Sequence, residues 1–160
     1  MFTVAKLLNE IPKEGKVEIK KLEKILKLTK KADRNELQIA VKALTTLGIV
    51  KDIGENSLEL CGDQEFIEAR LRCSSKGYCF AIRDDGGEDI YIRDQFLNHA
   101  WNGDRVLVKV TREGIRRRSP EGGVQCILER HSSNLLGFID NEDDNPIIVP
   151  LDDRILSTIN

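Results

Sequence analysis

The amino-acid sequence predicts an α+β chain in which helices come first and strands follow. Two patterns carry this prediction. Apolar residues recur at helical spacing in residues 1–60, and short runs of alternating apolar and polar residues begin at residue 66. Turns containing glycine, asparagine or aspartate separate these runs, as is typical of antiparallel strands. We therefore predict three successive domains, at residues 1–62, 63–131 and 132–160.

Three helices are predicted in the first domain. Helical spacing of apolar residues marks residues 4–11, 19–26 and 37–47. Asp33 is followed three residues later by Glu36, a pair that resembles a capping box at the start of the third helix. Gly48 suits the left-handed position just beyond the end of that helix.

Two short alternating segments, residues 49–50 and 57–60, follow the helices and predict a small hairpin. Three helices and a hairpin form a winged helix-turn-helix. The third helix would expose Arg34, Gln38 and Lys42, which can contact phosphates or base edges. Modules of this kind also serve protein interaction or packing, and a charged helix face is often only solvated, so both interpretations stay open.

Residues 76–93 are the most informative stretch for function, because they predict a hairpin with aromatic rings on one face. Side chains at i and i+2 of a strand share a face. Tyr78 therefore projects with Phe80, and Tyr91 projects with Arg93 on the neighbouring strand. Such a face suits unpaired bases, since stacking on an aromatic ring contributes roughly 1–3 kcal/mol per base.

The alternative for this hairpin is that two of its rings belong to the core. Ala81, Ile82, Ile90 and Ile92 already supply apolar side chains there, which favours the binding face. Lys76 adds a cation at the edge of that face.

The hairpin belongs to a set of five predicted strands. Alternating runs at residues 66–72, 105–110 and 122–128 supply the strands that flank it. Five strands within about 65 residues fit one small closed barrel. The hairpin segments resemble the two RNA-binding motifs of cold-shock domains, which are five-stranded OB-folds that bind single strands on this face.

A narrower resemblance rests on three further segments. Residues 84–92, 102–108 and 127–130 are similar to the first cold-shock domain of the ribonuclease R/ribonuclease II family of bacterial exoribonucleases. Residues 136–139 and 146–153 resemble the opening of that family's second cold-shock domain. The resemblance covers about two thirds of the chain, and a winged helix before the cold-shock domains agrees with it.

The resemblance implies the activity of a longer parent protein. Members of this family degrade RNA hydrolytically from the 3′ end, with Mg²⁺ or Mn²⁺ held by aspartates in a separate downstream domain. The aspartate-rich motif of that domain has no match here, so no catalytic residue, metal site or cofactor is predicted in this chain. Single-stranded RNA is the expected partner, and the winged helix is expected to assist with structured RNA. The expected location is the cytoplasm.

Charge is distributed unevenly along the chain. The net charge is −2 overall, with 12 basic against 9 acidic residues in residues 1–60 and 1 against 6 in residues 132–160. Affinity for RNA must therefore come from local patches rather than from the field of the whole molecule. The densest patch is Arg116, Arg117 and Arg118, with Arg112 nearby, in the loop before the last barrel strand. This patch is either a loop that is only solvated or a loop that borders the binding groove, and both interpretations stay open.

Composition excludes several other classes of protein. No apolar run approaches the roughly 18 residues of a membrane span, so no membrane partner is expected. The four cysteines show no C-x-x-C spacing and no histidine cluster accompanies them, which argues against a zinc site and predicts reduced thiols. No triad, P-loop or paired metal-binding motif is present.

Two other functions compete with the exoribonuclease interpretation. One is a freestanding regulator whose winged helix reads duplex DNA while the OB-fold binds single strands. The other is a protein-interaction adaptor that uses the barrel as a scaffold. Residues 136–160 contain only the first strands expected of a second barrel, and open strands leave backbone groups unpaired. The sequence is therefore interpreted as a piece of a longer protein.

Overall fold

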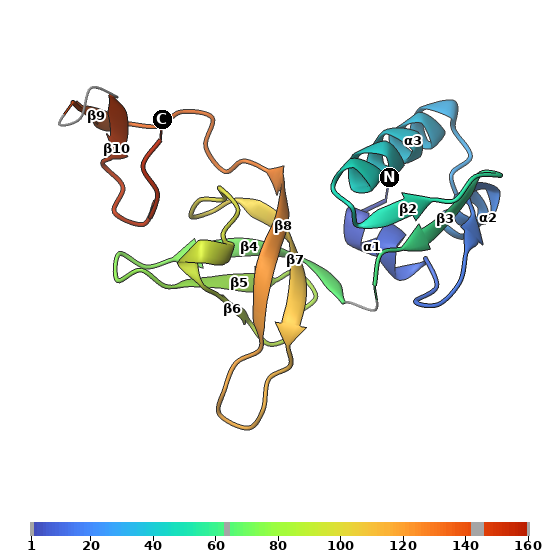
Figure 1. Cartoon of the computed structure of the whole chain (residues 1–160), viewed down its shortest axis with the longest axis horizontal. Coiled ribbons are helices and arrows are strands. Elements are labelled where there is room, and N and C mark those ends of the chain that lie inside the picture. The colour runs from blue at the N-terminus through green and yellow to red at the C-terminus, as the bar shows by residue number, and fades with distance from the viewer. Residues whose placement is uncertain (1, 63–64, 142–145, 160) are drawn as a thin grey trace. The chain divides into compact units, whose positions relative to one another are not determined.

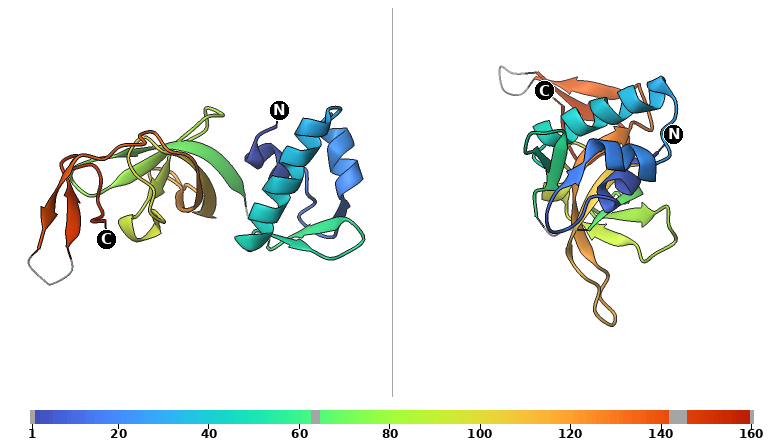
Figure 2. Two further views of the ribbon diagram at one scale, coloured as in Figure 1. Left: turned by 90° about the horizontal axis from the view of Figure 1, so that it is seen from above. Right: turned by 90° about the vertical axis from the view of Figure 1, so that its right-hand side faces the viewer.

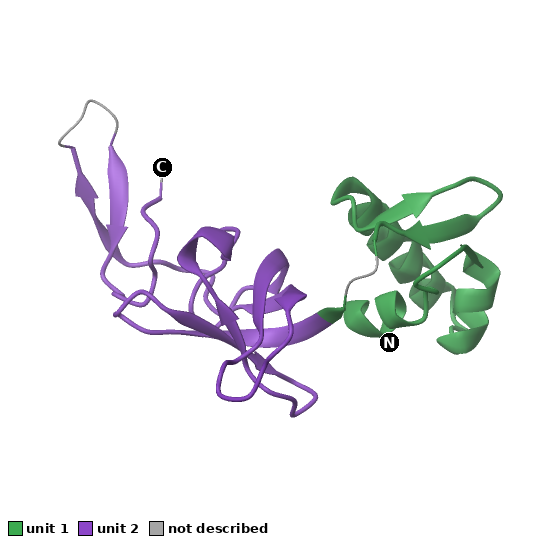
Figure 3. Ribbon diagram, turned by 60° about the horizontal axis from the view of Figure 1, so that its bottom comes forward, with its two compact units in different colours: residues 1–66 green, residues 67–160 purple. Residues whose placement is uncertain are grey.

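The computed structural model describes residues 2–62, 65–141 and 146–159. It divides into two compact units, Met1–Phe66 and Ile67–Asn160, which Figure 3 shows in different colours. Each unit buries its own set of apolar side chains, so each is described by itself. Within the described ranges, no helix has the length and apolar character needed to cross a membrane.

The first unit contains three helices and a three-stranded antiparallel sheet. In chain order the elements are α1 (Val4–Asn9), β1 (Val17–Glu18), α2 (Ile19–Ile25), α3 (Lys31–Thr46), β2 (Val50–Asp52) and β3 (Ser57–Leu60). β3 lies between β1 and β2 in the sheet. The predicted apolar stripes form the core, in which the most deeply buried side chains are Leu7, Leu8, Leu22, Leu37 and Leu58.

The long helix α3, visible in Figure 2 beside the hairpin of β2 and β3, differs from the prediction at its start. Its N-cap is Lys30, which makes no side-chain capping bond, so the predicted capping box at Asp33 is wrong. Asp33 lies in the first turn, where a carboxylate is favoured by the helix dipole instead. The predicted end is confirmed, because Gly48 has φ +70° and its N–H donates to the Thr45 carbonyl.

The second unit contains a closed five-stranded barrel, as predicted. Its elements are β4 (Phe66–Cys73), β5 (Cys79–Arg83), β6 (Ile90–Ile92), a 3₁₀ turn η1 (Asp94–Phe96), β7 (Arg105–Arg112) and β8 (Glu121–Glu129). The strand order around the barrel is β4-β5-β6-β8-β7. β6 and β8 pair in parallel, whereas the β4–β5, β5–β6 and β7–β8 pairings are antiparallel.

Alternate residues of the barrel strands fill its interior. Ala81, Ile90 and Ile92 are fully buried, so their neighbours in sequence must face outward. Gly122 is needed where strands approach closely, because a Cβ at this position would lie 2.7 Å from the Lys109 carbonyl oxygen. The interior therefore holds β5, β6 and β8 firmly and fixes which side chains they present outside.

Cysteine pairing differs from the prediction of reduced thiols. Cys73 at the end of β4 lies directly opposite Cys79 at the start of β5, with their Cα atoms 4.1 Å apart, and the two form a disulfide. The two cysteines are six residues apart, which matches no cysteine motif. The disulfide is therefore evident from the strand register and not from the sequence. Cys61 and Cys126 are free thiols, and burial raises the pKa of Cys126.

The barrel is followed by a separate two-stranded antiparallel sheet. It consists of β9 (Gly137–Asp140) and β10 (Ile147–Pro150), and Ile148 also forms a bridge with Ile159. Phe138 and Ile139 are 54% and 66% exposed, respectively. These strands form no second barrel within residues 132–141 and 146–159.

Candidate nucleic-acid interface

Three aromatic rings lie in contact on the outside of the barrel. Phe80 on β5 is directly opposite Tyr91 on β6, and their ring centroids are 5.5 Å apart. Tyr78, in the turn before β5, meets Phe80 edge-to-face at 6.2 Å. Tyr78 is 42% exposed, while Phe80 and Tyr91 are half-buried by each other and by the strands beneath them. The rings thus present a continuous aromatic surface.

The outward position of these rings follows from strand alternation. Cys79 and Ala81 on either side of Phe80 are fully buried, and so are Ile90 and Ile92 on either side of Tyr91. Small and β-branched side chains fill the interior, which leaves no room for rings there. The structure therefore brings together the three aromatic residues that the sequence singled out.

The register extends the aromatic surface into a row across four strands. Arg72 on β4 pairs with Phe80, Phe80 pairs with Tyr91, and Tyr91 pairs with Glu121 on β8. We call these four residues the cross-strand row. It begins with a cation, continues with two rings and ends with a carboxylate. A single strand lying along such a row would meet both charge and stacking surfaces.

Arg72 is a candidate contact that the sequence analysis did not select. Its side chain is exposed, and no hydrogen bond or ion pair joins it to any other residue that the structure describes. The alternation of Leu71, Arg72 and Cys73 places it outside, but only the pairing with Phe80 shows that it flanks a ring. An unpaired guanidinium there can bind a phosphate or stack on a base.

Lys76 lies at the tip of the turn between β4 and β5. The turn is closed by a hydrogen bond from the Ser74 N–H to the Tyr78 carbonyl at 2.9 Å, and Gly77 adopts φ +86° within it. Lys76 is exposed and its ammonium forms no hydrogen bond or ion pair with the residues that the structure describes, so it is available at the Tyr78 end of the aromatic surface.

Arg93 is held differently from Arg72. Its Nη2 lies 3.3 Å from Oε2 of Glu121, whose Oε1 lies 3.4 Å from Nη1 of Arg112. One carboxylate therefore lies between two guanidinium groups at the end of the cross-strand row. The sequence predicted a cation at Arg93, but it could not show that Glu121 compensates this charge.

A basic loop, residues 113–120, leaves the barrel beside Tyr91. The Tyr91 N–H donates to the Pro120 carbonyl at 2.8 Å, which fixes the end of the loop next to the ring. Ile115 and Arg118 pair across a tight turn with Arg116 and Arg117 at its corners. All three arginines are exposed, and the loop is the orange segment that extends beyond β7 and β8 in Figure 1.

The predicted contacts of the first unit, Arg34, Gln38 and Lys42, are exposed on α3. The Nε of Arg34 donates to the Leu28 carbonyl at 3.3 Å and lies 3.9 Å from the Glu23 carboxylate. Gln38 and Lys42 line a cavity of about 300 Å³ between α3 and β2. The structure thus keeps Gln38 and Lys42 together on α3 and directs Arg34 toward α2.

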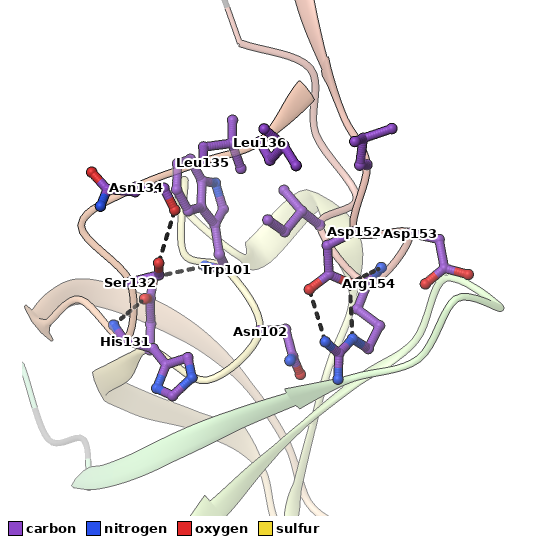
Figure 4. Close-up of a pocket in the computed structure, with 13 residues that line it drawn as sticks. Trp101, Asn102, His131, Ser132, Asn134, Leu135, Leu136, Asp152, Asp153 and Arg154 are labelled. Atoms are coloured by element: carbon purple, nitrogen blue, oxygen red, sulfur yellow. Dashed lines mark hydrogen bonds and ion pairs between the residues drawn. The ribbon is translucent and has the colours of Figure 1, made fainter. Parts of the chain in front are cut away.

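A cavity of about 840 Å³ in the second unit lies where the chain leaves the barrel (Figure 4). The buried Asp104 organises its floor. It accepts hydrogen bonds from the backbone N–H of Trp101 at 2.8 Å and of His131 at 3.0 Å, and from Nη1 of Arg130 at 2.7 Å. The Arg130 guanidinium also lies 4.3 Å from the Trp101 ring centroid. These contacts satisfy a buried charge and anchor the segment after β8.

The wall of this cavity carries a closed ion pair, in which both carboxylate oxygens of Asp152 accept from Arg154 at 2.8 Å. Hydrogen bonding from Arg154 lowers the pKa of Asp152. With Asp153 also on the wall, the cavity gains no excess of positive charge that would attract a phosphate. The cross-strand row is therefore the better candidate for binding RNA.

No group of three or more His, Cys, Asp or Glu side chains is placed to hold a metal ion within residues 2–62, 65–141 and 146–159. The described arrangement of rings and cations can stack bases and bind phosphates.

Two family models match the chain. Residues 69–127 match a family described as the ribonuclease B OB domain, and residues 5–59 match one described as the cyanobacterial RNase R N-terminal domain. The first match covers the barrel that carries the cross-strand row, and the second covers the helical unit.

Two relatives match most of this chain. The chain is 46% identical over 157 residues to the acetazolamide conferring resistance protein zam of Synechocystis sp., covering 97% of this chain and 20% of that protein. It is 24% identical over 123 residues to ribonuclease R of Acidithiobacillus ferrooxidans, covering 77% and 28%. The chain thus spans between about a fifth and about three tenths of the length of these relatives.

A solved structure of Mycoplasma genitalium RNase R in complex with ribose-methylated single-stranded RNA is 21% identical to the chain, with a TM-score of 0.41. The match covers 52% of this chain and 14% of the other. The apo form of the same protein has a TM-score of 0.40 with the same coverage.

Proposed function

The chain is an RNase R-like N-terminal region, and from this premise we propose that it binds single-stranded RNA across the cross-strand row for a longer exoribonuclease. The observation that carries the proposal is the cluster of Tyr78, Phe80 and Tyr91 outside the barrel. Rings on the outside of a barrel offer stacking surfaces for bases, and this use fits an OB barrel.

Cations at both ends of the aromatic surface support the proposal. Lys76 and Arg72 lie on the β4–β5 side, and the basic loop with Arg116, Arg117 and Arg118 begins beside Tyr91. A strand whose bases stack on the rings would pass its phosphates close to these groups. Because the chain carries a net charge of −2, these local cations must supply the electrostatic attraction.

Catalysis in the proposed parent protein belongs to a part of the protein outside this segment. The proposed reaction is hydrolysis of RNA from the 3′ end, for which two-metal mechanisms hold ions about 3.5–4 Å apart between carboxylates. We propose that the carboxylates that hold Mg²⁺ or Mn²⁺ for this reaction lie outside this segment. The segment's contribution is to bind the substrate and guide it.

We further propose the predicted domain organisation. The element order of the first unit, α1-β1-α2-α3-β2-β3, supports a winged helix at residues 1–62 that assists with structured RNA. Gln38 and Lys42 on α3 would supply its contacts, with Arg34 in a supporting position against α2. Residues 63–131 would be the first cold-shock domain, and residues 132–160 the start of a second. A ribonuclease of this kind is proposed to act in the cytoplasm, without a membrane partner.

Replacement of a central ring tests the proposal. Phe80→Ala should weaken binding of an unstructured oligouridylate by roughly 1–3 kcal/mol, because one stacking surface is lost. Fluorescence titration measures this effect. Phe138→Ala is the matched control, since Phe138 is an exposed phenylalanine on β9 that lies outside the ring cluster.

Two results would contradict the proposed function. One is that the chain without substitutions binds no oligouridylate at low salt. The other is a folded Phe80→Ala/Tyr91→Ala double variant that binds as tightly as the parent. In the second case, the binding surface would have to be the basic loop or the first unit.

A further inference from the structure

Glu121 occupies an unexpected position for an acidic residue in an RNA-binding surface. It begins β8, and its carboxylate lies between Arg93 and Arg112 at 3.3 and 3.4 Å. The Glu121 side chain is 21% exposed, whereas the two arginine side chains are 50% and 52% exposed. The carboxylate is therefore the inner group, and the two guanidinium groups lie outside it.

The location of this cluster connects two parts of the proposed interface. Glu121 pairs with Tyr91 in the sheet, so it ends the cross-strand row. It also pairs with Arg112, the last residue of β7, at the point where the basic loop begins. Glu121 and its two arginine partners therefore lie at the junction between the rings and the basic loop.

The effect of the carboxylate is to reduce the charge that a phosphate meets there. Two guanidinium groups alone carry a charge of two, and Glu121 lowers the net charge of the cluster to one. Exposed ion pairs of this kind contribute little to stability, typically about 0–1 kcal/mol. The stability of the fold therefore gives little reason for this anion to occur at this position, whereas its effect on the local potential is direct.

Single-stranded and duplex RNA respond differently to such a reduction. A duplex presents phosphates at high density but hides the faces of its bases, so it can use the cations and not the rings. A single strand can use both. Lowering the charge beside Tyr91 therefore weakens the electrostatic attraction for phosphates, which both single-stranded and duplex RNA can use. Stacking on the rings, which only a single strand can use, then has a larger share in the affinity.

We propose that Glu121 is a specificity-determining residue that favours single-stranded over duplex RNA by compensating the charges of Arg93 and Arg112. The inference rests on the proposed RNA-binding function of the cross-strand row. It adds to that function a reason why an acidic residue lies among the cations of the interface.

The test replaces Glu121 by the nearly isosteric glutamine. Glu121→Gln raises the net charge of the cluster from one to two, so the slope of log affinity against log salt should steepen by up to about 0.9 for duplex RNA and about 0.7 for a single strand. At about 0.1 M salt this difference lowers the preference for single strands by roughly 1.6-fold. The probes are an oligouridylate and a blunt RNA duplex of equal length, titrated at several salt concentrations.

Glu129→Gln is the matched control. Glu129 lies on the same strand, is exposed and forms no ion pair with any residue in the described ranges. Its replacement changes the net charge of the chain by the same amount at the other end of β8. Both salt slopes of Glu129→Gln should stay close to those of the parent.

The outcomes separate this inference from the proposed function. The inference is supported if Glu121→Gln steepens the slope of log affinity against log salt. Adding Arg93→Gln to this variant should then return the slope toward that of the unsubstituted chain. Unchanged slopes, or weaker binding of both probes, overturn it while the parent's own binding of oligouridylate still upholds the proposed function. A parent that binds neither probe overturns both. Thermal unfolding verifies the fold of each variant, and Glu121→Ser removes the same charge if the glutamine variant is unfolded.

Discussion

At the scale of single residues, the acidic turn between β5 and β6 holds a local ion pair. Arg83 donates to both carboxylate oxygens of Asp85, at 2.8 and 2.6 Å, and the Gly87 N–H donates to one of them at 3.0 Å. The hydrogen bond from Arg83 is the main reason why the pKa of Asp85 falls from 3.8 to about 2. Arg83 is therefore engaged at the turn.

This pair predicts a pH dependence. Because the folded-state pKa of Asp85 is depressed, its stabilising effect is present above pH 3.8 and is lost as the pH falls through about 2. We expect the Asp85 carboxyl to titrate near pH 2 in the folded chain, and Arg83→Gln to move its midpoint toward 3.8. Side-chain NMR titration measures both. An identical midpoint in the two proteins would show that Arg83 is not the cause.

Residue-scale prediction from sequence succeeded where strand alternation alone decides the outcome. The i, i+2 rule predicts that Tyr78 and Phe80 share a face, and the predicted hairpin adds Tyr91 from the next strand. The structure brings these three rings into contact. Arg72 and Glu121 required the register of β4 with β5 and of β6 with β8. A single sequence does not specify that register, so the ends of the cross-strand row could not be found from it.

At the scale of elements, the β4–β5 hairpin carries both the aromatic surface and a covalent restraint. Cys73 and Cys79 join the two strands immediately below the turn that holds Lys76 and Tyr78. The alternating strands were predictable from sequence, whereas the disulfide was not, because it depends on the two cysteines being opposite one another. The start of α3 is a similar case, since the capping signal at Asp33 was present but the helix begins earlier.

The disulfide predicts a measurable contribution to stability. Closing a loop of this length restricts the unfolded chain by roughly 2 kcal/mol. Reduction should lower the free energy of unfolding of the barrel by about that amount, measured by urea denaturation with and without dithiothreitol. A Cys61→Ser/Cys126→Ser variant keeps the disulfide and should show the same difference. If the Cys73→Ala/Cys79→Ala variant is as stable as the oxidised chain without substitutions, the disulfide does not contribute to stability by restricting the unfolded chain.

At the scale of the whole molecule, the parts of the chain differ in how completely they are packed. The helical unit and the barrel each bury a set of leucine, isoleucine and valine side chains. The sheet of β9 and β10 has two strands only, and a two-stranded sheet is at best marginally stable in water without further packing. The order of helices before strands was predictable from periodicity, since each part of the sequence has its own repeat.

This difference in packing predicts unequal protection of backbone amides. Amides of β9 and β10 should exchange with solvent much faster than those of β4–β8, because Phe138, Ile139 and Leu151 are more than half exposed and the sheet covers little apolar surface. Hydrogen exchange followed by NMR measures the protection of each amide. The Trp101 amide is an internal control, since it donates to the buried Asp104 at the base of the segment and should be well protected. Equal protection of β9, β10 and the barrel would mean that residues 137–150 are stabilised by contacts beyond those of a two-stranded sheet, and the domain boundary proposed at residue 132 would then be wrong.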